Sequence, residues 1–588
     1  MIKLYQKFAS FLGQKPSPHV IWLLSYFKGS KKFFLSIALM VPFIGAIEAG
    51  FIYLVKDLLQ YGFGNHQALM SFLRLGLLLV VAKLSLQLLY SKLLLERSSS
   101  ITARLRQEVF SKVLALEYQN SQSYNKSSIL TQLLTGLNDI AHFLSQFLIE
   151  LLKNVVVITS IIMMMCYLSF SLTLSLMIVM PFMYLVFKMS KKKVASYQTD
   201  LLSLSGGVQS QLLEVFNAND VINGYSAGKT FNDTFNNVNT SLKKKTIKLN
   251  FMGSLSKNIT EFLFSMPLFI IIFMISFGHY EITLPVFTAV LAGAQRLRAP
   301  MSSFSSMQIQ INKALIGAKL LHQFMQHKEV HYGHHIHQPF KNLSINYLSF
   351  SYDKKLVPAC TIKSLSIKAQ ERIMVLGSSG SGKSTFLKLL SGLYQKASGD
   401  CIYLNQYPIV EYTQLAKTKL LGYASQNHII FKMSLIDNIT LGSAFDERRF
   451  AEVCHLACIN DFIESLPHKG ETLLGTGATE LSGGQQQRVM LARLLYANTD
   501  ILLCDEITSA LDVHTEQRVM NGLLKLSDKT IIFVTHKLSL VEHFDRIILF
   551  SEGKIVADGS HDDLLMHNAS YQQFYIQYRD EESHVVAH

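Results

Sequence analysis

The sequence predicts an all-α membrane domain of six helices with long cytosolic helical extensions, followed by an α/β domain that contains a phosphate-binding loop. Composition gives the first indication: 49% of the 588 residues are hydrophobic and 16% are charged, with a mean hydropathy of +0.25. Soluble domains carry about 25% charged residues, so part of this chain belongs in lipid and part in water. Long apolar stretches fill the first half, and the glycine-rich loop lies in the second.

Six apolar stretches within residues 31–325 are long enough to cross a bilayer, because a spanning helix needs about 20 mostly apolar residues. The third and fourth stretches nearly fuse at a tight turn around Ser169. Residues 1–30 precede them as a cytosolic or elbow segment, since residues 1–14 lack the apolar core and cleavage site of a signal peptide. The six predicted spans are approximately residues 33–55, 68–95, 143–170, 171–188, 259–277 and 284–308.

The distribution of cations predicts the orientation of these spans. Lys and Arg are concentrated between the second and third spans and between the fourth and fifth, whereas the turns after the third and fifth spans carry none. Cytoplasmic loops hold the excess of Lys and Arg, so those segments and both termini are expected in the cytosol. Apolar residues at helical spacing over residues 101–116 and 201–216 predict helices that continue below the membrane, with turns near 119–128 and 218–228.

Residues 326–340 form a histidine-rich linker, and two interpretations of it stand. The tract could bind a metal, or it could be a solvated connection, because its spacing matches no closed ligand set. Cys454 and Cys458 likewise suit either a metal or redox pair or two small residues that face a core. Six cysteines in a chain of this length predict reduced thiols, not a disulfide framework. The linker histidines are His327, His331, His334, His335 and His337.

From residue 341 to 580, short β-rich runs alternate with helical runs, as in an α/β domain, and residues 581–588 form a tail. The strand-like run 372–376 leads into Gly377-Ser-Ser-Gly-Ser-Gly-Lys-Ser384 and then a helical run, which is GxxxxGK[ST] in the context that it requires. Lys383 is expected to reach the β- and γ-phosphates, and the Ser384 hydroxyl to bind Mg²⁺. The expected ATP-binding residues here are Gly377, Ser378, Ser379, Gly380, Ser381, Gly382, Lys383, Ser384 and Thr385.

A second strand-like run, residues 501–504, ends in two carboxylates. Asp505 is suited to hold Mg²⁺ through water, and Glu506 to polarise the attacking water. A buried strand that merely ends in charges does not explain why both carboxylates follow a phosphate loop. The two motifs together predict an α/β P-loop ATPase domain with ATP and Mg²⁺ as its cofactors.

Between these motifs, Leu481-Ser-Gly-Gly-Gln485 resembles the signature of ATP-binding cassette (ABC) ATPases. The resemblance implies that Tyr352 stacks on adenine and that Gln426 senses Mg²⁺ and water. It also implies that His536 contacts the γ-phosphate and that the loop ending in Asp512 crosses to a partner. The catalytic set is then Glu506, His536 and Gln426, and the metal set is Ser384, Gln426 and Asp505.

In this family the signature of one subunit completes the ATP site of the other, so the resemblance implies a second copy of the chain as partner. The nucleotide-binding residues that the signature adds are Ser482, Gly483, Gly484 and Gln485. Residues 167–174, followed by Pro181, and residues 314–321 resemble the membrane domain of the family's exporters. One departure is Gly475-Thr-Gly-Ala478, where many such exporters carry Gly-Glu-Arg-Gly.

The resemblance implies ATP-driven export or flipping of a hydrophobic or amphipathic substrate, a lipid, lipid-linked glycan, drug or peptide, by a homodimer. The expected location is a bacterial inner membrane. A net charge of +14 also suits an ATPase that acts on nucleic acid, but six spans with cations on one side argue against that partner. A second alternative is a membrane ATPase that gates or regulates a process instead of pumping a substrate. The resemblance favours an exporter over an importer, because importers of the superfamily usually keep cassette and spans on separate chains.

Ionisable residues inside spans are candidates for function. Glu48 lies in the first predicted span, and Arg296 and Arg298 lie in the sixth. One hypothesis is that an arginine there binds an anionic head group on a lipid or a lipid-linked sugar. The alternative is that the arginines form structural pairs with other helices or lie in the hydrated lower half of the span.

Overall fold

The computed structural model describes residues 18–26, 31–62, 66–119, 136–144, 148–177, 179–276, 283–352, 357–394, 401–475 and 477–586. The chain divides into two units. The first comprises residues 1–115 and 122–327, and the second comprises residues 116–121 and 328–588. Most of the expected N-terminal segment, the turn expected at 119–128 beyond residue 119, and Thr476 lie outside the described residues.

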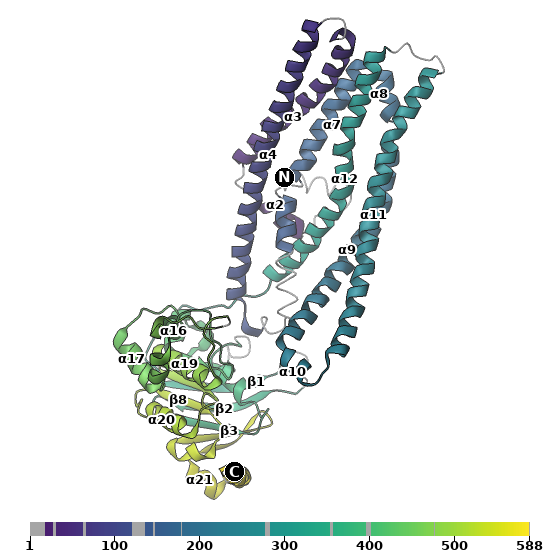
Figure 1. The fold of residues 1–588 in the computed structure, drawn as a ribbon. Coiled ribbons are helices and arrows are strands. Elements are labelled where there is room, and N and C mark those ends of the chain that lie inside the picture. The colour runs from purple at the N-terminus through teal and green to yellow at the C-terminus, as the bar shows by residue number, and fades with distance from the viewer. Residues whose placement is uncertain are drawn as a thin grey trace. The chain divides into compact units, whose positions relative to one another are not determined.

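The helices of the first unit, most of them labelled in Figure 1, are α2 (Pro18–Ser25), α3 (Lys31–Asp57), the π-helical η1 (Leu58–Gly62), α4 (His66–Ala115), α7 (Leu148–Leu168), α8 (Phe170–Met177), α9 (Val179–Asn217), α10 (Asn219–Gly224), α11 (Gly228–Ser276) and α12 (Leu284–Met325). Ser169 separates two of these helices, where a tight turn was predicted. Helices α3, α4 and α12 contain the first, second and sixth predicted spans in full, α7 contains residues 148–168 of the third, and α11 contains residues 259–276 of the fifth.

The length of these helices confirms that they continue past the spans. Helix α4 has 50 residues, about 75 Å at 1.5 Å per residue, whereas the hydrocarbon core of a bilayer is about 30 Å thick. Along α4 large apolar side chains are exposed, Leu77 to 68% and Leu88 to 63%, as expected of a surface that faces lipid. In the described part of the chain, three helices are long and apolar enough to cross a membrane by length and composition: Lys31–Gly62, His66–Ala115 and Ile149–Leu168.

Residues 171–177 and 179–188 of the fourth predicted span are helical, in α8 and α9, and Ile178 between them lies outside the described residues. The turn predicted near residues 218–228 is present and contains the short helix α10.

The second unit is built on one ten-stranded sheet with the order β5-β4-β1-β2-β10-β9-β3-β8-β7-β6. Strands β6, β7, β8, β3 and β9 are parallel, and the remaining part is mostly antiparallel. The strands are β1 (Asn342–Phe350), β2 (Cys360–Lys368), β3 (Arg372–Gly377), β4 (Ile402–Leu404), β5 (Tyr407–Pro408), β6 (Leu421–Ala424), β7 (Ile501–Asp505), β8 (Thr530–Val534), β9 (Arg546–Ser551) and β10 (Lys554–Gly559).

Apolar side chains form a core on each face of this sheet. Successive residues of a strand point to opposite faces, so Met374 and Val375 of β3 enter different clusters. Helix α19 covers one face through Val489, and α13 covers the other through Phe386. The helices of the unit are α13 (Lys383–Leu390), α15 (Gln414–Leu420), α16 (Leu435–Thr440), α17 (Glu447–Leu456), α18 (Asn460–Ser465), α19 (Gly483–Tyr496), α20 (Val513–Leu524), α21 (His561–His567) and α22 (Ala569–Val586).

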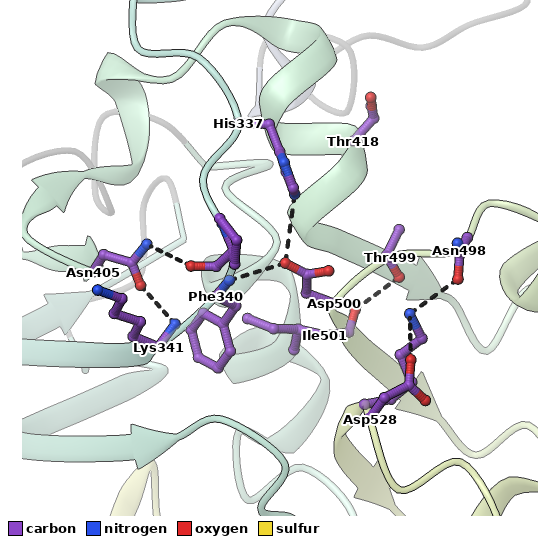
Figure 2. Close-up of polar contacts among 12 residues, drawn as sticks. His337, Phe340, Lys341, Asn405, Thr418, Asn498, Thr499, Asp500, Ile501 and Asp528 are labelled. Atoms are coloured by element: carbon purple, nitrogen blue, oxygen red, sulfur yellow. Dashed lines mark hydrogen bonds and ion pairs between the residues drawn. The ribbon is translucent and has the colours of Figure 1, made fainter.

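The histidine-rich linker is bound to the second unit at two points. His335 stacks on Tyr407 with ring centroids 3.9 Å apart, and its Nε2 lies 3.2 Å from Glu411 Oε2. Asp500 Oδ2 accepts a hydrogen bond from the backbone N–H of Phe340 at 3.0 Å and lies 3.5 Å from His337 Nε2, as Figure 2 shows. Among the described residues, no group of three or more His, Cys, Asp or Glu side chains is placed to hold a metal ion. At least two of the histidines therefore contact protein groups, so the linker is not wholly solvated.

Candidate active site

The phosphate loop lies between β3 and α13, and its glycines have conformations that other residues rarely adopt. Gly377 has φ +144° and Gly382 has φ +105°. A Cβ at Gly377 would lie 2.3 Å from the carbonyl oxygen of Phe550, and one at Gly382 would lie 2.6 Å from that of Ala359. Side chains at these two positions would therefore collide with backbone, which explains the spacing of the motif.

Lys383 is buried at the centre of this loop. Its Nζ donates hydrogen bonds to the carbonyl oxygens of Gly377 at 2.7 Å and Ser378 at 2.8 Å. Burial lowers the pKa of Lys383, while the charges of Glu506 and Asp505 oppose that shift. The loop thus holds the amine beside the backbone groups that the motif presents to phosphate.

Ser384 and Asp505 are brought together from different elements. The Ser384 Oγ donates a hydrogen bond to Asp505 Oδ1 at 3.0 Å, and Tyr423 Oη donates to Asp505 Oδ2 at 3.3 Å. Burial raises the pKa of Asp505, and the hydrogen bond from Ser384 opposes the rise. Sequence analysis missed Tyr423, although its place in β6 shortly before Gln426 was a usable signal.

Glu506 contacts both of the other expected catalytic residues, His536 and Gln426. Its Oε1 lies 2.6 Å from His536 Nε2, and its Oε2 accepts a hydrogen bond from Gln426 Nε2 at 2.9 Å. The backbone of Glu506 has φ +53°, a left-handed conformation that is uncommon for a residue with a side chain. Such positions persist where surrounding structure enforces them, which is typical of functional sites.

Tyr352 lies beside the start of α13. Its Oη is 2.8 Å from Thr385 Oγ1, and its ring packs edge-on against Phe350 with centroids 5.0 Å apart. The ring of Tyr394 lies 6.0 Å away and adds a third aromatic group that sequence analysis did not identify. An aromatic surface therefore borders the phosphate loop, as stacking on a base requires.

The signature forms the N-terminus of α19. Ser482 caps this helix: its Oγ accepts a hydrogen bond from the N–H of Gln485 at 3.3 Å, and Gln485 Oε1 accepts one from the N–H of Ser482 at 2.9 Å. Gly484 approaches the next loop so closely that a Cβ would lie 2.9 Å from the carbonyl oxygen of Ala510. The side chains of Ser482 and Gln485 therefore also stabilise the first turn of α19.

Gln487, which sequence analysis missed, connects the signature helix to the loop that ends in Asp512. Its buried side chain donates to Ser509 Oγ at 2.8 Å and accepts from the N–H of Ala510 at 2.9 Å. Asp512 caps α20 by accepting from the N–H of Thr515 at 2.9 Å, and this hydrogen bond lowers the pKa of Asp512. In the part of the chain that the structure describes, no hydrogen bond or ion pair joins residues 482–485 to residues 377–385.

A phosphate loop, a strand that ends in two carboxylates and a membrane domain in the same chain define a membrane-bound nucleotide hydrolase. A family model described as ABC transporter matches residues 361–509, and one described as ABC transporter transmembrane region matches residues 34–293. The chain belongs to the ABC transporter family. It is an integral membrane protein that binds ATP and couples ATP hydrolysis to transport.

Similar proteins cover nearly the whole chain. An "ATP-dependent lipid A-core flippase 2" from Colwellia psychrerythraea is 28% identical over 94% of this chain and 96% of its own length. An "ATP-dependent lipid A-core flippase" from Coxiella burnetii is 25% identical over 90% and 91%. A solved bacterial Atm1-family ABC exporter with ATP bound has a TM-score of 0.82 and 21% identity, covering 93% of this chain and 98% of that one, which confirms the exporter fold.

Proposed function

We propose that the chain works as a homodimer in a bacterial inner membrane, where it uses ATP and Mg²⁺ to move a lipid with an anionic head group from the inner to the outer leaflet. The names of relatives that match over nine-tenths of both chains support a lipid as substrate. The observation that supports an anionic head group on that lipid is a charged cluster inside the predicted spans.

That cluster joins α3, α4 and α12. Glu48 Oε1 lies 2.7 Å from Lys83 Nζ, and Glu48 Oε2 pairs with Arg296 Nη1. One carboxylate therefore faces two cations, which leaves one excess positive charge. A charge is costly at that depth unless it has a partner, so the cluster favours a substrate that supplies a negative group.

Arg298 has a different environment, although it follows Arg296 by two residues. Its Nη2 lies 2.8 Å from Glu261 Oε2, so its charge is already matched within the chain. The side chain of Arg296 instead lies with its guanidinium 4.4 Å from the ring centroid of Phe51 and shares Glu48 with Lys83. Arg298 therefore forms a structural pair with Glu261. Lys83 and Arg296 are left as the candidates for binding an anionic head group.

The nucleotide site suits Mg²⁺ by the chemistry of its oxygen donors. Mg²⁺ prefers carboxylate and hydroxyl oxygens, and Ser384 and Asp505 present these groups 3.0 Å apart. Gln426 adds an amide next to Glu506. Ser384, Asp505 and Gln426 would hold the ion, which neutralises phosphate charge when it is bound.

In the reaction that we propose, Glu506 orients and polarises the attacking water, and His536 and Gln426 fix the direction of its carboxylate. Lys383 and the loop N–H groups bind the phosphates. Because residues 482–485 make no described hydrogen bond to the phosphate loop of the same chain, Ser482 and Gly484 are free to meet the nucleotide of a second copy. The turn at 221–229 would transmit closure of the nucleotide domains to the spans, and the corresponding turn at 121–126 lies outside the described residues.

The experiment compares lipid-stimulated ATPase activity in nanodiscs for Lys83→Gln and Arg298→Gln, with lipids that carry or lack a head-group phosphate. We expect Lys83→Gln to raise the half-saturating concentration of the phosphorylated lipid about tenfold and to leave basal turnover unchanged. Arg298→Gln is the matched control, because Glu261 already neutralises that charge. Equal effects of both variants, or equal stimulation by both lipids, would contradict an anionic head-group site.

A further inference from the structure

A cavity of about 490 Å³ lies in the first unit among α9, α11, α12 and the helical residues 136–144. Its lining positions recur every three or four residues along α9, α11 and α12, so one face of each helix forms a wall. Ligand cavities in proteins measure about 300–1,000 Å³, and a single buried water needs far less room. The cavity is therefore large enough for a small organic group.

This cavity lies on the cytosolic side of the predicted spans. Gln198 of α9 lies about 15 Å along the helix beyond the predicted end of the fourth span at residue 188, and Lys313 of α12 lies about 8 Å beyond the end of the sixth at residue 308. On α11, Thr246 and Asn250 precede the fifth span, which begins near residue 259. The site is separate from the Glu48 cluster, which lies within the spans.

Two of the lining side chains have hydrogen-bonding capacity that the described protein does not use. The Oε1 atoms of Gln198 and Gln209 are buried and have no hydrogen-bond partner among the described residues, and the Gln198 side chain is only 7% exposed. A buried polar group without a partner costs free energy. Both amides line the cavity, so a polar ligand there would satisfy them.

The charges around the cavity indicate which ligand fits. Asp139 and Lys313 line it together, so carboxylate and ammonium groups balance and neither an anion nor a cation is favoured. Burial raises the pKa of Asp139, while Lys313 and His142 oppose the rise. An amide both donates and accepts hydrogen bonds, as does a hydroxyl group, and the remaining walls include leucine and isoleucine side chains against which a sugar ring can pack.

We propose that this cavity binds a neutral saccharide group, whose hydroxyls form hydrogen bonds with Gln198 and Gln209. The inference rests on the proposed lipid transport only for the source of the saccharide, which would be the sugar head of the transported lipid as it is taken up from the cytosolic leaflet. The lipid's acidic group would then meet the Glu48 cluster, and its sugar the cytosolic cavity.

The test uses the full chain in nanodiscs and two probes, an intact lipid A-core glycolipid and the soluble neutral saccharide obtained by removing its acyl chains and its acidic groups. Equilibrium binding of the radiolabelled saccharide is measured for the wild type, Gln198→Leu and Gln209→Leu. We expect each substitution to weaken binding about fivefold, and the double variant about thirtyfold, as the loss of one hydrogen bond at each position implies. Basal ATPase activity should not change.

Gln211→Leu is the matched control, because Gln211 is also on α9, has a buried and unpartnered Oε1, and lines a different cavity. It should leave saccharide binding unchanged, whereas Gln198→Glu, which keeps acceptor oxygens, should retain most of it. Absence of saccharide binding to the wild type, or equal loss in Gln211→Leu, would overturn the proposal. If the saccharide binds but the glycolipid is not transported, the saccharide site stands and the proposed function fails. If Gln198→Leu and the wild type transport the glycolipid equally well at limiting concentration, the proposed function stands and the saccharide site fails.

Discussion

His536 Nε2 lies 2.6 Å from Glu506 Oε1, and Gln426 holds the other oxygen of the same carboxylate. The two contacts fix a side chain whose backbone is itself in a left-handed conformation. A carboxylate held in this way is oriented before any substrate binds, which lowers the cost of orientation during reaction.

Replacing Glu506 by Gln tests its role as the group that polarises water. The amide keeps the size of the side chain but accepts protons poorly, so ATP turnover should fall at least about 100-fold while ATP binding persists. Steady-state phosphate release and equilibrium binding of ATP measure the two effects. Turnover equal to that of the wild type would assign the role to another group.

Glu48→Gln should destabilise the membrane unit, because it leaves Lys83 and Arg296 without their shared carboxylate. The Glu48 side chain is 12% exposed and those of Lys83 and Arg296 are 29% and 32% exposed, so the cost should lie below that of a fully buried pair, at about 1–2 kcal/mol. Thermal unfolding in detergent measures this. Glu96→Gln is the control, since Glu96 and Lys92 form an exposed pair at 3.9 Å whose loss should cost less than about 1 kcal/mol.

Gly317→Ala should separate α12 from residues 136–144. A Cβ at Gly317 would lie 3.0 Å from Gly136 Cα and 3.1 Å from its carbonyl oxygen, and overpacking of this kind costs about 1–3 kcal/mol. The midpoint of thermal unfolding should fall accordingly. Gly224→Ala, where a Cβ meets nothing within 4 Å, should leave the midpoint almost unchanged; a drop of the same size in both would refute the steric explanation.

Lys417 predicts a pH dependence of the nucleotide domain. Burial lowers the pKa of Lys417 from 10.5 to about 8, and its Nζ donates to the carbonyl oxygen of Gly392 at 3.0 Å. Between pH 8 and 10.5 the unfolded chain keeps a proton that the folded domain has lost, so the free energy of unfolding should rise with pH across that window.

Chemical denaturation of the nucleotide domain at several pH values measures the rise, which should total up to about 3 kcal/mol. Lys417→Met removes the titrating group and should abolish that part of the slope. A wild-type profile that matches the variant's would show that Lys417 titrates normally.

The sequence was most informative where backbone geometry requires a particular residue. Gly377 and Gly382 could be identified because no other residue tolerates their φ values and close contacts, and the strand before Asp505 followed from its apolar run. The extension of α4 and α9 past the predicted spans was also predictable, since helical spacing does not depend on partners far away in the chain.

Contacts between distant segments could not be predicted in the same way. Nothing local to Gln487 indicates that it binds Ser509 and Ala510, and nothing near Glu48 indicates that it joins Lys83 with Arg296. Those pairings depend on how helices pack, which a spacing pattern does not encode. The linker histidines gave a compositional signal for metal or solvent, but contacts to Asp500 and Glu411 depend on the folded surface beneath them.

The attachment of the linker to Asp500 has a mechanical consequence. Asp500 immediately precedes β7, and Asp505, about 16 Å further along that extended strand, carries the carboxylate expected to serve the metal. An extended strand stretches little, so tension applied through the amide of Phe340 would reach the hydrolytic centre as a displacement along one rigid rod. The linker after α12 would therefore transmit a pull on Phe340 to Asp500, and through β7 to Asp505.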